Sequence, residues 1–82
     1  MKNLIMITPE QSRGARGLLS WGRPDLSRES KIGIATIAAF ELGERSLTTK
    51  TMNKLVGAFT KHGITFENTA KKITVSLETE NL

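Results

Sequence analysis

The stretch RPDLSRESKIGIATIAAFE, from Arg23 to Glu41, decides the fold of this 82-residue chain. It predicts two short helices separated by a tight break at residues 30–33, which read Ser-Lys-Ile-Gly. Two helices that meet at a steep angle through a three- or four-residue turn, often containing glycine, form a helix-turn-helix unit. Such a unit cannot bury its inner face alone, so flanking helices are expected. The apolar positions of that inner face are Leu26, Ile32, Ile37 and Phe40.

The residues before this stretch predict a first helix over about residues 9–20. Thr8 and Gln11 have the spacing of a capping box, and a proline stands at the first helical position. Gly14 and Gly17 inside the helix each cost about 1 kcal/mol relative to alanine, which indicates either close backbone approach or simple tolerance. The expected inner face is Ala15, Leu18 and Leu19, followed by Trp21.

The residues after Glu41 predict a fourth helix and then a β-hairpin. Residues 50–62 carry an apolar stripe with helical spacing at Met52, Leu55, Val56 and Phe59. Beyond Gly63 the apolar period changes from helical to alternating, which predicts strands near 64–67 and 73–78. The fold class expected is therefore mainly α, with four helices followed by a C-terminal β-hairpin.

The hairpin needs a partner, because an isolated two-stranded hairpin is marginal in water. It can pack on the helices, pair with residues 3–7, or pair with its counterpart in a second subunit. We favour the last arrangement, a homodimer, over a sheet closed within a monomer, because edge pairing across a two-fold axis satisfies open backbone groups. The expected dimerisation residues are Ile64, Phe66, Ile73, Val75 and Leu77.

Length and composition indicate one small globular domain, with 38% hydrophobic and 24% charged residues. Residues 1–7 are expected to form an arm or a short strand, 8–63 the helical domain, and 64–82 the hairpin and tail. The apolar run at residues 4–7 is too short for a signal peptide or a membrane span, so a cytoplasmic protein is expected.

The residue types present do not favour enzyme chemistry. The chain has no cysteine, so neither a disulfide nor a cysteine-based zinc site is expected. The single His62 has no serine, cysteine or carboxylate constellation beside it. We therefore predict no catalytic residue, no metal site, no cofactor and no small-molecule ligand. Trp21 is expected to pack in the core, at the junction of two helices.

Positive charge is concentrated in the helical part of the chain. Residues 1–63 carry ten Lys and Arg against five Asp and Glu, a balance of +5, whereas residues 64–82 carry two against three, a balance of −1. An excess of this kind on one part of a small domain is typical of a surface that meets phosphate. An ordinary solvated basic surface is the alternative.

Many residues in one register resemble the XRE family, the Cro and phage-repressor type of helix-turn-helix DNA-binding protein. The resemblance covers about residues 8–63 and is closest to small bacterial regulators. It implies a lambda-repressor-like four-helix domain. The matching residues are Thr8 to Gln11, Arg13, Ala15, Arg16, Leu18, Leu19, Trp21, Asp25, Leu26, Arg28, Ser30, Thr36, Ile37, Phe40, Glu41 and Gly43. Those relatives also often end in a segment like Gly63 to Phe66 and a second strand.

The resemblance implies roles for particular residues. Arg16 is expected to form a structural ion pair with Glu41, which would tie together the helices that flank the motif. Arg23 matches a position that usually touches the phosphate backbone of DNA. Residues at the start and outer face of the third helix match the base-reading positions. The implied DNA-binding set is Arg13, Arg23, Lys31, Gly33, Ile34, Ala35, Thr36, Ala39, Arg45 and Lys50.

The third helix departs from the family pattern at its base-reading positions, Ile34, Ala35, Thr36, Ala38 and Ala39, which we call the reading face. Relatives commonly have a long polar residue where this chain has Ile34, and a frequent Asp or Gln is replaced by Ala39. Arginine on guanine and glutamine or asparagine on adenine are the usual bidentate base contacts. None is available here, and only Thr36 among the base-reading positions carries a hydrogen-bonding side chain.

Three hypotheses follow. The first is a dimeric transcriptional regulator on a two-half-site operator in double-stranded DNA, nucleoid-associated when bound, with limited direct base readout. It would change polymerase access sterically or by recruitment. The second is a protein-interaction module, such as an anti-activator or adaptor, whose third helix offers an apolar surface to a partner protein. The third is a folded domain in which some of these residues are simply buried.

Overall fold

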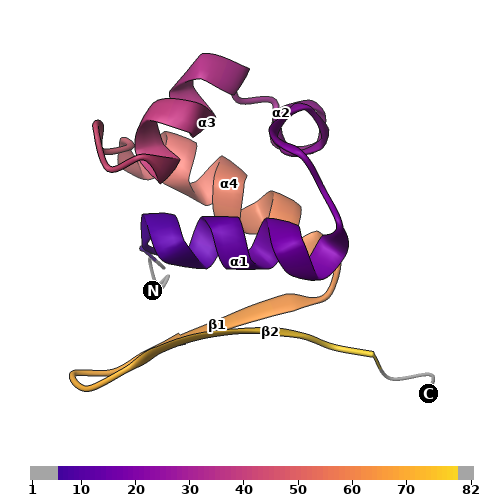
Figure 1. Cartoon of the computed structure of the whole chain (residues 1–82), viewed down its shortest axis with the longest axis vertical. Helices are drawn as coiled ribbons and strands as arrows, with labels where there is room; N and C mark the ends of the chain where they lie inside the picture. The colour runs from indigo at the N-terminus through magenta and orange to yellow at the C-terminus, as the bar shows by residue number, and fades with distance from the viewer. Residues whose placement is uncertain (1–5, 80–82) are drawn as a thin grey trace.

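Four helices and a two-stranded antiparallel hairpin make up the computed structural model, which describes residues 6–79. Figure 1 shows α2 and α3 at one end of the molecule and the hairpin at the other, with α1 and α4 between them. The prediction of a small, mainly helical domain ending in a hairpin is confirmed. The elements are α1 (Pro9–Leu19), α2 (Arg23–Ser30), α3 (Ile34–Glu41), α4 (Thr49–Lys61), β1 (Ile64–Asn68) and β2 (Ile73–Leu77).

The break between α2 and α3 falls where the sequence predicts it, at residues 31–33. Lys31 ends α2 in the left-handed conformation, with φ 64° and ψ 29°. Gly33 is the N-cap of α3 and supplies no side-chain hydrogen bond. All four apolar positions expected to face inward, Leu26, Ile32, Ile37 and Phe40, are at most 5% exposed.

Helix α1 begins with the predicted capping box. The Gln11 amide donates to the Thr8 hydroxyl at 3.1 Å, and the Thr8 amide donates to Gln11 Oε1 at 3.0 Å. Gly14 is explained by close approach, because a Cβ there would lie 3.1 Å from Val75 Cγ1 on β2. Gly17 has open space around it. Leu18 does not face inward as predicted: it is 45% exposed.

Helix α4 supplies the centre of the core. Its predicted stripe of Met52, Leu55, Val56 and Phe59 is buried. The Phe59 ring lies 6.0 Å from that of Trp21 and 5.9 Å from that of Phe66. Trp21 also contacts His62 edge-on at 4.9 Å. These aromatic contacts join the end of α1, helix α4 and strand β1, so Trp21 packs against the core as predicted.

The hairpin packs one face against the helices and leaves the other polar. Its register pairs Ile64 with Leu77 and Phe66 with Val75, which places the apolar residues of both strands on one face. The opposite face carries Thr65, Glu67, Thr74 and Ser76. Of the possible partners for the hairpin, the structure provides the helices of its own chain (Figure 1).

A buried glutamine fastens the hairpin to α1. Gln11 is 2% exposed, and its Nε2 donates to Asn68 Oδ1 and to the Thr74 carbonyl, both at 2.6 Å. The capping box therefore serves two purposes, because the same side chain that starts α1 also holds both strands. The sequence pattern predicted only the first purpose.

The expected N-terminal strand lies mostly outside the described residues, since it was placed at residues 3–7. Of that segment, Met6 and Ile7 are not in a strand. The Met6 carbonyl accepts a hydrogen bond from Asn68 Nδ2 at 3.1 Å, and Ile7 is buried in the core. Across residues 6–79, none of the helices is long and apolar enough to cross a membrane.

Candidate nucleic-acid interface

Glu41, the last residue of α3, is a fully buried carboxylate. Arg16 on α1 donates to it from Nη2 at 2.8 Å and from Nε at 3.0 and 3.2 Å. The Ser12 hydroxyl donates to Oε2 at 2.5 Å. The ion pair expected between Arg16 and Glu41 is therefore present, and it joins α1 to α3.

Arg23 is the second cationic partner of Glu41. Its Nε lies 3.0 Å from Oε1, and its side chain is 31% exposed. Burial raises the pKa of Glu41, but hydrogen bonds from Arg16, Ser12 and Arg23 outweigh that effect and hold the pKa below its ordinary value of 4.5. Two positive charges thus surround one negative charge, and the carboxylate is hidden from solvent.

Two arginines expected to contact phosphate are held by the protein itself. Arg23 is engaged with Glu41, and Arg13 Nη1 donates to the Glu41 carbonyl at the end of α3. Arg13 also lies 4.0 Å from Glu10. Both side chains thus help to fix α3 against α1 and α2, and their contact with phosphate stays a prediction. Sequence spacing did not reveal this, because Glu41 meets these side chains only after three helices have packed.

The outer face of α3 is exposed and uncharged. Ile34 is 47% exposed, Ala35 is exposed, and Thr36, Ala38 and Ala39 are half-buried. Leu42, directly after α3, is 62% exposed. Burial within the domain, the third hypothesis, therefore does not apply to Ile34 and Ala35, whereas Thr36, Ala38 and Ala39 are partly covered.

Exposed cations flank α3 at both ends. Lys31 lies in the turn before it, and Arg45 and Lys50 follow in the loop and the first turn of α4. Glu44 is an exposed carboxylate in the same loop. Within the described part of the chain, the cations without an ion-pair partner are Lys31, Arg45, Lys50, Lys54, Lys61, Lys71 and Lys72.

The predicted DNA-binding residues thus divide into two groups. Lys31, Gly33, Ile34, Ala35 and Thr36 lie together at the turn and the first turn of α3. Ala39 lies one turn further along that helix, and Arg45 and Lys50 lie beyond its end. Arg13 and Arg23 form the second group, packed around Glu41. The cations of the first group have no ion-pair partner among the described residues, whereas Arg13 and Arg23 bond to Glu41 and remain partly exposed.

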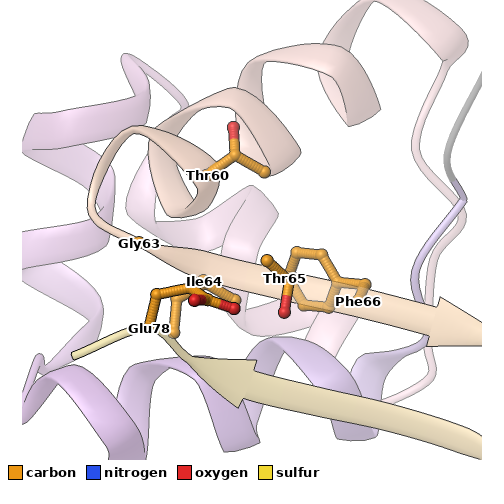
Figure 2. A pocket seen from close by; sticks show the side chains of 6 residues that line it. All are labelled: Thr60, Gly63, Ile64, Thr65, Phe66 and Glu78. Atoms are coloured by element: carbon orange, nitrogen blue, oxygen red, sulfur yellow. The ribbon is translucent and has the colours of Figure 1, made fainter. Parts of the chain in front are cut away.

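A hollow of about 390 Å³ lies away from this face, beside the start of the hairpin. Figure 2 shows Thr60 on the last turn of α4 and Glu78 just beyond β2, on either side of the start of β1. Gly63, Ile64, Thr65 and Phe66 complete the lining. Its polar side-chain groups are the hydroxyls of Thr60 and Thr65 and the carboxylate of Glu78. Residues 6–79 contain no cluster of three side chains that could hold a metal ion.

The residues expected to form a dimer interface are mostly used within the chain. Ile64 is 1% exposed, and Phe66, Val75 and Leu77 are half-buried against the core. Ile73 is 44% exposed because it lies next to the hairpin turn. The side chain of Ile64 is therefore covered within the chain, Ile73 is the accessible member of the set, and dimerisation through the strand edges stays a prediction.

Comparison with models of known protein families finds no match for this chain, and comparison with curated protein sequences finds none.

Proposed function

We propose that this protein is a transcriptional regulator of the XRE type that binds double-stranded DNA through a lambda-repressor-like helix-turn-helix unit. In this proposal α2 and α3 are the two helices of the unit, and α3 lies in the major groove. The observation that carries the proposal is the composition of the α3 surface: an exposed, uncharged helix face flanked by unpaired cations, with its only carboxylate buried and neutralised.

The dimensions of α3 suit a major groove. With its side chains an α-helix is about 10–12 Å across. The groove is about 12 Å wide and admits one helix. Alanines on the outer face make α3 slimmer than an average helix, so its backbone can approach the base edges closely.

Phosphate contacts are assigned to Lys31, Arg45 and Lys50. These side chains are exposed, and no described carboxylate holds them. The first-turn amides of α3 add a second attraction, since Gly33 leaves them without a side-chain cap and helix N-termini favour anions. Because phosphate neutralisation releases counterions, affinity should fall steeply with salt.

Assembly as a homodimer remains part of the proposal, with contact at a strand edge. The inner face of the hairpin is covered by helices, and its outer face is polar. Pairing edge to edge about a two-fold axis perpendicular to the sheet leaves the helices of both copies on the same side. Both α3 helices could then meet two half-sites about one helical turn apart on one DNA.

The proposal is tested by measuring binding to a library of genomic fragments, first at about 50 mM salt and then at rising salt. Arg45→Ala and Lys50→Ala should each weaken binding to all fragments and, because a dimer loses two contacts, reduce the salt slope by about 2. Lys71→Ala removes the same charge from the hairpin turn, at the other end of the molecule (Figure 1), and should leave both quantities unchanged.

A second candidate function is a protein-interaction module. It is favoured by the exposed side chains of Ile34 and Leu42, which would be buried by a partner helix. This function predicts no salt-dependent binding to any genomic fragment at low salt. The same library experiment therefore separates the two candidates.

A further inference from the structure

The reading face of α3 has an unusual chemistry for a helix in the major groove. This inference rests on the proposed DNA-binding function. Ile34, Ala35 and Ala39 offer only hydrocarbon to a base edge, and Thr36 offers one hydroxyl. Guanine, cytosine and adenine carry no methyl group in the major groove, whereas thymine presents one at C5. Thymine is thus the one base with which an aliphatic face makes a favourable contact.

Ile34 is the residue best placed for that contact. It stands in the first turn of α3, immediately after the N-cap, and is 47% exposed. In a helix-turn-helix unit the N-terminal residues of the second helix contact the bases. Burying an exposed isoleucine against a methyl group is favourable in proportion to the apolar area removed from water.

The surroundings of Ile34 favour DNA over an apolar protein partner. Lys31 lies three residues before it, and Arg45 and Lys50 lie beyond the other end of the helix. A nucleic acid supplies negative charge on both sides of a groove, which matches cations on both sides of an apolar helix face. The negative charge of Glu41 does not repel DNA phosphates, because Glu41 is fully buried and paired with two arginines.

We propose that α3 selects its DNA by covering thymine C5 methyl groups with Ile34 and the neighbouring alanines, so the protein binds sites with thymine at these positions. Discrimination then depends on hydrocarbon contact and requires no bidentate hydrogen bond. Removing one covered methyl group should weaken binding about fourfold, the equivalent of about 0.8 kcal/mol.

The test uses three DNA duplexes: alternating dA and dT, the same duplex with deoxyuridine in place of thymidine, and alternating dG and dC. Deoxyuridine pairs as thymidine does but lacks the C5 methyl group. Unchanged protein should bind the thymidine duplex at least about fourfold more tightly than the deoxyuridine duplex. The salt dependence should be the same for both, because the phosphates are unchanged.

Two matched variants assign the effect to the reading face. Ile34→Ala should bind the thymidine and deoxyuridine duplexes within about a factor of two of each other, because little hydrocarbon remains to cover the methyl group. Leu42→Ala also shortens an exposed aliphatic side chain, but at the far end of α3, and should keep the full discrimination. Circular dichroism of both variants verifies that the helices are intact.

Each outcome has one meaning. Salt-dependent binding with equal affinity for thymidine and deoxyuridine duplexes overturns the methyl contact and leaves the DNA-binding function standing. Discrimination that persists in Ile34→Ala overturns the assignment to α3. Absence of salt-dependent binding to all three duplexes overturns the proposed function together with this inference, and points to the protein-interaction module.

Discussion

The guanidinium of Arg16 and the buried carboxylate of Glu41 join α1 to α3 through three hydrogen bonds of 2.8 to 3.2 Å. Arg23 adds a bond from the start of α2, so one carboxylate holds three helices together. A buried charge that loses its partner is costly, whereas a satisfied one can fix a unique arrangement. This network sets the orientation of α3 and therefore of the proposed reading face.

Removing the carboxylate should destabilise the whole domain. Glu41→Ala is expected to lower the free energy of unfolding by about 3 kcal/mol, because two arginines lose their partner in a partly buried site. Urea unfolding followed by circular dichroism measures the change. Arg28→Ala is the matched control: its ion pair with Asp25 is exposed, so its loss should change stability little. Equal losses in the two variants would contradict a structural role for Glu41.

Stability should also depend on pH through Glu41. Its pKa is lower in the folded protein than in the unfolded chain, so its contribution is complete above the ordinary value of 4.5 and is lost as pH falls below it. Melting temperatures between about pH 6 and pH 3 should therefore fall more steeply for unchanged protein than for Glu41→Gln. The pKa of Asp25 is also lowered, first by the hydrogen bond from Arg28 and then by that from the Gly22 amide. Asp25 is present in both proteins, so its titration does not contribute to the difference between them. Identical pH profiles would exclude Glu41 as the source.

Lys31 combines backbone strain with a proposed phosphate contact. A non-glycine residue in the left-handed conformation costs about 1 kcal/mol, so Lys31→Gly should raise the free energy of unfolding by that amount. The same change removes a cation next to α3 in each subunit, so it should weaken DNA binding and reduce the salt slope of the dimer by about 2. Unfolding and binding measurements on the same samples test whether Lys31→Gly gains stability while it loses affinity for DNA. A variant that gains stability and keeps full affinity would remove Lys31 from the phosphate contacts.

Dimerisation at the hairpin should be sensitive to Ile73. This side chain is 44% exposed, so Ile73→Lys is expected to leave the fold intact while opposing contact between two hairpins. Light scattering should report twice the chain mass of 9.0 kDa for unchanged protein and a lower mass for the variant. Thr65→Lys adds the same charge to the polar outer face and should remain dimeric. A mass of 9.0 kDa for unchanged protein would show that the chain is monomeric.

Much of the local structure could be predicted because it depends on neighbours in the chain. The capping pair of Thr8 and Gln11 is three residues apart, and the α4 stripe repeats with the helical period. The alternating residues of β1 and β2 likewise predicted which face is apolar. The same reasoning predicts that Leu18 faces inward, but Leu18 is exposed. The reason is that α1 packs against β2 and α3 with other residues of the helix.

The roles of the arginines could not be predicted in the same way. The pair of Arg16 and Glu41 is expected from a resemblance. The bonds of Arg13 and Arg23 to Glu41 are not expected, because only a phosphate contact is predicted for these two residues. Which cations bond to a buried residue such as Glu41 depends on contacts between residues far apart in the sequence. The hydrogen bonds from Gln11 to Asn68 and Thr74 are of the same kind.

The sequence by itself determined the order of helices and strands, the turn at residues 31–33 and the aliphatic character of α3, because periodicity, capping and side-chain chemistry are local properties. The tertiary structure alone decided which charges remain free around α3. Packing of α1, α2 and α3 buries Glu41 and removes its negative charge from the surface, while Lys31, Arg45 and Lys50 stay exposed. Because the carboxylate is buried and the cations are exposed, the surroundings of the proposed reading face are net positive.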